Sequence, residues 1–207
     1  AAATTRAVVE AEALSTRAIE LAPDLAPAWG QRGYHRFRKR DHEGAAADYR
    51  EAARLEPRSS LHHYNLSLNL AAGNDPAGAL AALERALTLD PTLRAKSRFE
   101  HCDYLNKLGR IPEAIAALEE LLAITPGDGR ALGRIGYLHF RQKDHAEAVT
   151  YYTRAIAAAP DDPSHLVNRA FNLRELGRHA EALRDGARAV AQRPDWPKPG
   201  TPAGPRA

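Results

Sequence analysis

The stretch WGQRGYHRFRKRDHEGAAADYREAARLEP, Trp29 to Pro57, decides the fold, because its closing proline recurs along the chain. Prolines that follow similar alanine-rich stretches are 34, 34, 35, 34 and 34 residues apart; they are Pro23, Pro57, Pro91, Pro126, Pro160 and Pro194. A proline lacks the amide hydrogen that a helix needs and disfavours helical backbone in the residue before it. Each proline therefore marks the end of a helix in a repeat of about 34 residues.

Small residues recur at fixed places in this repeat. When the proline is numbered position 32, position 20 is always alanine (Ala45, Ala79, Ala114, Ala148 and Ala182). Position 8 is always small (Gly33, Ser67, Cys102, Gly136 and Ala170), so two helices can approach closely there. A helix breaker lies in the middle of each repeat, and no stretch shows the alternation of a strand. Each repeat is predicted to be a helix A, a short turn and a helix B.

The repeats define the domain organisation. We expect an N-terminal half repeat over residues 1–22, with a helix B at 7–22 and no helix A before it. Five full repeats follow within 23–194, at about 26–57, 60–91, 95–126, 129–160 and 163–194. The stretch PDWPK begins another helix A that the next prolines abort, leaving a proline-rich tail over 195–207. This tail is either a flexible linker or an extended strip that lies over the last helix. In the second case Trp196 would cover that helix.

The repeat resembles the tetratricopeptide repeat (TPR), which has the same period and the same small–alanine–alanine–proline skeleton. In the first full repeat the matching residues are Trp29, Gly33, Ala45, Tyr49, Ala52 and Pro57. The resemblance covers about residues 7–194 and implies an all-α, right-handed superhelical solenoid. The departures are one extra residue in the third repeat, the polar Arg36 and His139 at position 11, and Gly186 at a position that is usually bulky.

Composition narrows the class of protein. Hydrophobic residues make up 44% of the chain and charged residues 27%, as in a water-soluble globular protein, and no run of about 18 apolar residues exists. The first twenty residues do not resemble a signal peptide. The absence of methionine suggests processing or a longer parent chain. The net charge of +3 is too small to favour nucleic acid as a partner.

The resemblance also places a binding surface. In this family the helix A positions 2, 5, 6, 9, 12 and 13 line the concave face. Seven of the thirteen aromatic residues (4 Phe, 7 Tyr, 2 Trp) fall on these positions, including all four phenylalanines. The same positions carry seven Lys or Arg against three acidic residues, a net charge of +4. Rings give rigid contact area and arginine binds carboxylates through two hydrogen bonds, so we expect an acidic or carboxylate-bearing peptide as the ligand.

The predicted peptide-binding residues are Tyr34, Phe37, Arg38, Tyr64, Asn65, Phe99, Arg130, Arg134, Tyr137, Phe140, Arg141, Asn168, Phe171 and Arg174. The competing interpretation is that some rings belong to the core, above all Phe37 and Phe140, which follow the polar position 11. The first and fourth repeats share Gly, Tyr, Phe, Arg and Asp-His at matching positions. These two patches either grip two similar ligand segments or reflect duplication without functional meaning.

Other functions are weighed and set aside. The family's carboxylate clamp for acidic chaperone tails needs five residues, and only Asn168 and Lys198 match it. His42, His145 and His179 share position 17 and are interpreted as packing residues, so no metal and no cofactor are expected. No catalytic arrangement stands out, and we expect no enzyme activity. The prediction is a protein-interaction module; the alternative is the substrate-recruiting region of a larger enzyme or of an envelope or secretion assembly. The uncovered N-terminal helix predicts a homodimer or a contact with further sequence.

Overall fold

The computed structural model describes residues 2–192 of the chain, and side chains from residue 8 onward. Trp196, Lys198 and the tail predicted over 195–207 lie outside the described residues. Within 2–192 the chain forms twelve helices and no strand, and the all-α prediction is confirmed. The helices group into two modules that meet between Ala114 and Ile115, within α8 (Ile111–Ile124).

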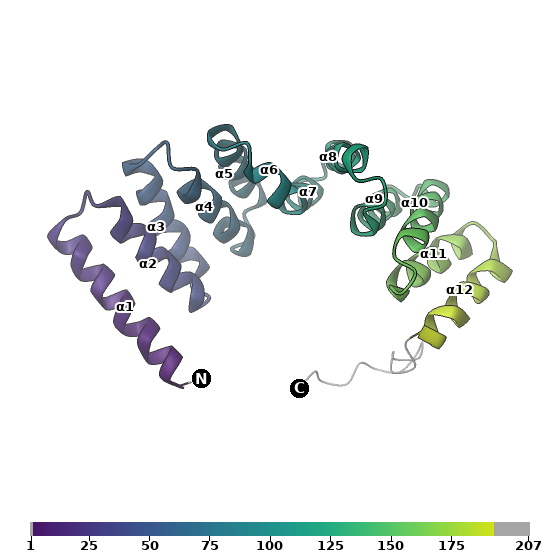
Figure 1. Cartoon of the computed structure of the whole chain (residues 1–207), viewed down its shortest axis with the longest axis horizontal. Helices are drawn as coiled ribbons and strands as arrows, with labels where there is room; N and C mark the ends of the chain where they lie inside the picture. Colours follow the sequence, from purple (N-terminus) through teal and green to yellow (C-terminus); the bar gives the residue numbers. More distant parts are fainter. Residues whose placement is uncertain (1, 193–207) are drawn as a thin grey trace. The chain divides into compact units, whose positions relative to one another are not determined.

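The N-terminal module is a row of antiparallel helices in which each helix packs on the next (Figure 1). Its helices are α1 (Ala2–Leu21), α2 (Ala26–Arg38), α3 (His42–Leu55), α4 (Ser60–Ala72), α5 (Pro76–Leu89), α6 (Leu93–Lys96) and α7 (Arg98–Lys107). The C-terminal module is built in the same way. Its helices after α8 are α9 (Gly129–Arg141), α10 (His145–Ala158), α11 (Pro163–Glu175) and α12 (His179–Gln192).

The turn between helices A and B has the same geometry in every full repeat. The residue at position 15 has a positive φ of 63° to 75°, and these residues are Arg40, Asn74, Gly109, Lys143 and Gly177. Positive φ is unstrained for glycine and well tolerated by asparagine, so only the turns at Arg40 and Lys143 use residues that rarely adopt it. In three repeats the residue immediately before helix B is an aspartate. Its carboxylate accepts a hydrogen bond from an amide in the first turn of that helix, as Asp41 does from the Gly44 amide at 2.9 Å.

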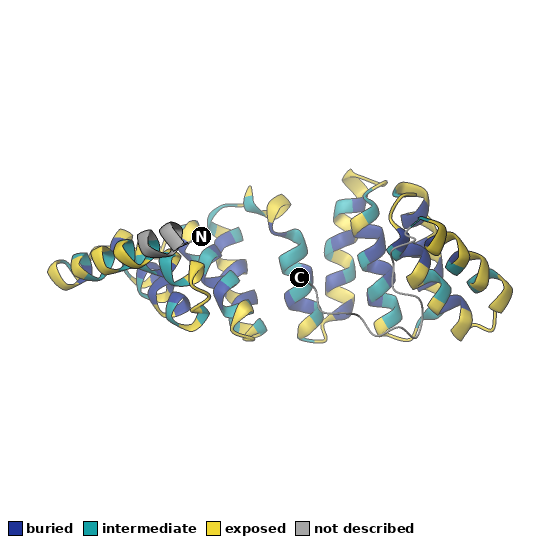
Figure 2. Cartoon of the chain, turned by 90° about the horizontal axis from the view of Figure 1, so that it is seen from below, coloured by how far each residue is buried: buried dark blue, intermediate teal, exposed yellow. Residues whose placement is uncertain are grey.

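The core lies where neighbouring helices meet (Figure 2). The position-20 alanines described as buried include Ala45, Ala79 and Ala148, which have no exposed surface. Bulky side chains fill the space beside them: Tyr49 packs with Leu66 in the N-terminal module, and Ile156 packs with Leu166 in the C-terminal module. Small alanines thus lie beside bulky side chains in the core of each module.

The third repeat departs from this pattern. Its helix A is divided into α6 and α7, and Ser97 forms the junction. Ser97 is buried, and its hydroxyl donates a hydrogen bond to the Leu93 carbonyl at 2.9 Å. The extra residue of this repeat coincides with the break, because an inserted residue must leave the helical register somewhere between two packed helices.

One side of α1 is not covered within the described chain. Val9, Leu14 and Leu21 are exposed on this helix, and 72% of Leu14 is accessible to solvent. The other side packs on α2, where Ile19 is buried. In a full repeat a helix A would cover the exposed side, and α1 has no helix A before it in the sequence described.

Candidate peptide-binding surfaces

An open pocket of about 510 Å³ lies between α2 and α4 in the N-terminal module. Its lining comes mainly from helix A positions of the first and second repeats. The lining residues are Pro27, Gly30, Gln31, Tyr34, Tyr49, Glu56, Ser59, Leu61, His62 and Asn65.

Two glycines let the pocket form. A Cβ on Gly30 would lie 3.1 Å from the ring of His62, and a Cβ on Gly33 would lie 3.1 Å from the ring of Tyr49. Larger residues at these places would push both rings out of position. Glycine at positions 5 and 8 therefore lets His62 and Tyr49 form the wall and the floor of the pocket.

The pocket combines rings with a few polar groups. Tyr34 lies on the rim with 46% of its surface exposed, and Asn65 is half-buried. Burial raises the pKa of Tyr49 to about 12, so its hydroxyl is neutral at physiological pH. The Oε2 of Glu56 and the Nε2 of His62 form a hydrogen bond of 3.1 Å. Glu56 contributes the carboxylate of the lining, and no Lys or Arg is among the lining residues.

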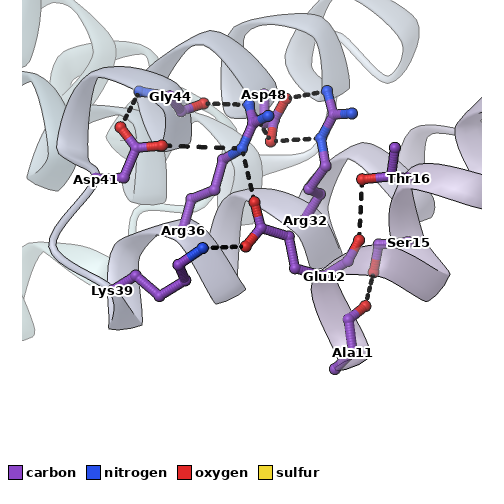
Figure 3. A network of polar contacts seen from close by, with 10 residues as sticks. All are labelled: Ala11, Glu12, Ser15, Thr16, Arg32, Arg36, Lys39, Asp41, Gly44 and Asp48. Atoms are coloured by element: carbon purple, nitrogen blue, oxygen red, sulfur yellow. Dashed lines mark hydrogen bonds and ion pairs between the residues drawn. The ribbon is translucent and has the colours of Figure 1, made fainter. Parts of the chain in front are cut away.

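A network of ion pairs joins α1, α2 and α3 in the same module (Figure 3). Asp48, only 1% exposed, accepts two hydrogen bonds from the Arg32 guanidinium at 3.0 and 2.7 Å. Arg36 lies 3.1 Å from the same carboxylate and 3.4 Å from Glu12 of α1. Lys39 donates to Glu12 at 2.7 Å. The polar residue at position 11 thus ties α1, α2 and α3 together.

Ion pairing shifts the pKa of two members of this network. The hydrogen bond from Lys39, with a further one from Arg36, lowers the pKa of Glu12 below its usual range. The hydrogen bond to Asp48 raises the pKa of Arg32. With Asp41, 3.9 Å from Arg36, the network brings three basic side chains together with three acidic ones.

The C-terminal module repeats this construction between α9 and α11. A Cβ on Gly133 would overlap the ring of His165, and one on Gly136 would lie 3.1 Å from the ring of Tyr152. Arg169 donates two hydrogen bonds to Asp185, both of 2.7 Å. The glycine contacts are thus shared by the first and fourth repeats, whereas Arg169 on α11 and Asp185 on α12 reproduce the Arg32–Asp48 pair in the fifth repeat.

Aromatic side chains form a continuous row in the C-terminal module. The ring centres of Tyr137 and Phe140 are 6.1 Å apart, and Phe140 meets Phe171 edge to face at 5.4 Å. The guanidinium of Arg174 lies 4.7 Å above the ring of Phe171. Phe171 is exposed, so the row ends on the surface next to a cation.

Further polar residues of the predicted binding surface lie on the same two helices as this row. Arg130 and Arg141 are exposed on α9, Arg134 is half-buried there, and Asn168 is exposed on α11. The fourth and fifth repeats therefore bring together most of the cations that the sequence analysis assigned to the binding surface.

The remaining predicted residues are more scattered. Phe37 is exposed and meets the ring of His42 edge to face at 5.9 Å, and Arg38 is exposed beside it at the end of α2. Tyr64 is buried, at 7% exposed, with the ammonium group of Lys96 5.0 Å above its ring. Phe99 is half-buried on α7. Tyr64 is thus largely a packing residue, while Tyr34, Phe37 and Phe171 are accessible.

The sequence reasoning missed Glu56 and His62 in the pocket. A signal was present: glycine at position 5 of one repeat is paired with histidine at position 3 of the next, as in Gly30 with His62 and again in Gly133 with His165. A second pairing joins helix B to the next helix A, since His145 lies 2.8 Å from the amide oxygen of Asn172.

The part of the chain that the structure describes contains neither a metal-ligand cluster nor a helix able to span a membrane. No group of three or more His, Cys, Asp or Glu in residues 2–192 is arranged to hold a metal ion. Cys102 is a buried free cysteine at the small position 8. No helix in this range combines the length and the apolar character needed to cross a bilayer.

The chain belongs to the tetratricopeptide repeat family. The family model matches residues 31–93 and 102–163, more than half of the sequence, so the resemblance inferred from the repeats is confirmed. The chain is accordingly a protein-interaction module built from TPR helix pairs. No curated protein matches the chain in sequence.

Several solved structures share the fold. YrrB, described as a TPR protein with an unusual peptide-binding site, has 18% identity and a TM-score of 0.68, over 88% of this chain and 93% of YrrB. MamA from Desulfovibrio magneticus RS-1 has 18% identity and a TM-score of 0.73, over 84% of this chain and 97% of MamA. PilW, described as a widely conserved type IV pilus biogenesis factor, has 21% identity and a TM-score of 0.69, over 90% of this chain and 86% of PilW. At sequence identities this low, the similarity concerns the fold alone.

Proposed function

We propose that the chain binds extended peptide segments of partner proteins on its A helices and has no catalysis of its own. The observation that carries this proposal is the row of rings from Tyr137 through Phe140 to Phe171, which reaches the surface beside Arg174. Rigid rings present contact area with little loss of conformational entropy, which is typical of residues that dominate binding. The peptide-binding site named for YrrB supports this use of the fold.

The ligand of the C-terminal module is an acidic or carboxylate-bearing segment. Arg130, Arg134, Arg141 and Arg174 all lie on α9 and α11, around the aromatic row. A guanidinium binds a carboxylate through two parallel hydrogen bonds and also stacks on rings, so this surface favours a peptide that alternates acidic and apolar side chains.

The experiment is a binding titration of the full chain with capped peptides, in which acidic and apolar residues alternate, followed by fluorescence anisotropy. Arg134→Glu combined with Arg141→Glu should weaken binding by at least about a hundredfold, since two charge-assisted contacts become repulsive. The matched control combines Arg184→Glu with Arg188→Glu, an equal change in charge on exposed positions of α12. It should leave the affinity within about twofold, because these residues lie outside the proposed surface.

Unchanged affinity in the α9 variant would refute the acidic specificity. Equal weakening in both variants would show that only the net charge matters, and the assignment of a site would fail. If no peptide of any charge binds the full chain, the proposed function itself is wrong.

The biological setting of the chain remains one of two kinds. The first is an adaptor that acts by itself, and the second is the recruiting region of a larger enzyme or of an envelope or secretion assembly; the likeness to PilW, a pilus biogenesis factor, supports the second.

A second copy of the chain could cover Val9, Leu14 and Leu21 on α1. Sedimentation of the chain with and without Leu14→Glu tests this: a dimer that the variant disrupts supports self-association, and a monomer in both contradicts it.

A further inference from the structure

The α2–α4 pocket and the matching site between α9 and α11 share most of their residue types but differ in charge. The α2–α4 pocket has Pro27, Gln31 and Glu56 in its lining. The equivalent positions of the fourth repeat carry Arg130, Arg134 and Ala159, as counted along the 34-residue repeat. The first site therefore lacks the two cations of the second, whereas the glycine, tyrosine and histidine framework is the same in both. Each site has one carboxylate beside its histidine: Glu56 in the first, and Asp162, at the position of Ser59, in the second.

Glu56 is placed to contact a ligand. About half of its side chain is exposed, at 49%. The residue ends α3, and its backbone amide donates to the Ala52 carbonyl, so the helix end does not depend on the carboxylate. The contact with His62 uses Oε2, one of the two carboxylate oxygens. A carboxylate accepts several hydrogen bonds at once, so a cationic group can bind Glu56 while the His62 contact persists.

The rest of the lining suits a long side chain with a cationic tip. The exposed ring of Tyr34 offers its face to a cation, and Pro27 and Leu61 offer apolar surface to the methylene groups behind it. Asn65 adds an amide that can bond to the peptide backbone. Arg54 and Arg58, each two residues from Glu56 in the sequence, are exposed and are not part of the lining.

We infer that the α2–α4 pocket receives a lysine or arginine side chain of a partner peptide, with Glu56 as its counter-ion. This inference rests on the proposed peptide-binding function and assigns to the N-terminal module a charge preference opposite to that of the C-terminal module. One chain then carries two sites that select segments of opposite charge. A uniformly acidic ligand, which the sequence alone favoured for the whole surface, would be repelled at the first site.

The test uses the full chain labelled with nitrogen-15 and three acetylated, amidated pentapeptides, Leu-Ala-X-Ala-Leu, in which X is lysine, norleucine or glutamate. The side-chain amide signals of Asn65 and Asn168 report separately on the two sites. We expect the lysine peptide to shift the Asn65 signal and to bind about tenfold more tightly there than the norleucine peptide, as for one charge-assisted hydrogen bond at a partly exposed site.

Two variants separate charge from structure. Glu56→Gln keeps a hydrogen-bond acceptor for His62 and should abolish the tenfold preference. Glu51→Gln, also on α3, removes an equal charge from a residue that pairs with Arg54 at 2.8 Å outside the lining, and it should keep the preference.

The outcomes distinguish this inference from the proposed function. Equal binding of the lysine and norleucine peptides at Asn65, tighter binding of the glutamate peptide there, or an unchanged preference in Glu56→Gln would overturn the inference. A shift of Asn168 alone would also overturn it and would leave peptide binding intact. If none of the peptides shifts either signal, both the inference and the proposed function fail.

Discussion

Replacement of Asp48 by asparagine is expected to destabilise the N-terminal module strongly. Asp48 is almost completely buried, and its carboxylate pairs with Arg32 at 2.7 Å and with Arg36 at 3.1 Å. The side chains of Arg32 and Arg36 are themselves only 13% and 25% exposed, so water cannot replace the lost partner. Removal of one member of a buried ion pair typically costs about 3–5 kcal/mol, and we expect a loss in this range.

The C-terminal module provides the internal comparison. Asp185 occupies the same repeat position and pairs with one guanidinium, that of Arg169, at 2.7 Å. Since Arg169 and Asp185 are 20% and 9% exposed, and only one cation is left uncompensated, Asp185→Asn should cost less, about 2 kcal/mol. The difference between the two variants measures the contribution of Arg36 and of the contacts to α1.

Hydrogen exchange measured by mass spectrometry is the suitable assay, because modules of a repeat protein can unfold separately. A loss of about 3 kcal/mol raises the open population of α2 and α3 by roughly two orders of magnitude. The same variant should leave the exchange of α11 and α12 unchanged. A change below about 1 kcal/mol in α2 and α3, or a larger effect of Asp185→Asn, would refute the reasoning.

Acid should loosen α1, because the Lys39 hydrogen bond lowers the pKa of Glu12: its stabilising effect is complete above the unfolded-state pKa of about 4.3 and disappears as the pH falls through the lower folded-state value. Exchange of α1 amides from neutral pH to about pH 3 measures this loss, and a Glu12→Gln variant that still shows it would contradict the explanation. Alkali should destabilise the N-terminal module between pH values of about 10 and 12, since the unfolded chain ionises Tyr49 first; urea titrations should find a smaller loss in Tyr49→Phe. Gly133→Ala should destabilise the chain by about 1–3 kcal/mol, because its Cβ would overlap a histidine ring, whereas Gly186→Ala, with nothing within 4 Å, should stabilise α12 by roughly 0.5–1 kcal/mol. Thermal unfolding of the two glycine variants measures both effects, and shifts of their Tm in the same direction would refute the packing argument.

The sequence by itself determined the helix pairs, the repeat period and the family. These features depend on local chemistry: a proline ends a helix, a small residue lets two helices approach, and both recur at fixed spacing. Even the division of helix A in the third repeat has a trace in the sequence, as one extra residue before Pro126. The candidate rings could also be proposed from their positions alone.

Only the tertiary structure decided which of these residues are accessible and which are paired. Tyr34 and Tyr64 are both tyrosines on A helices, yet one is 46% exposed and the other 7%. Arg36 meets Glu12, 24 residues away, across a helix contact that no local pattern encodes. Side-chain burial and ion pairing depend on non-local packing, whereas helix boundaries depend on neighbours in the chain, and this difference separates what could be predicted from what could not.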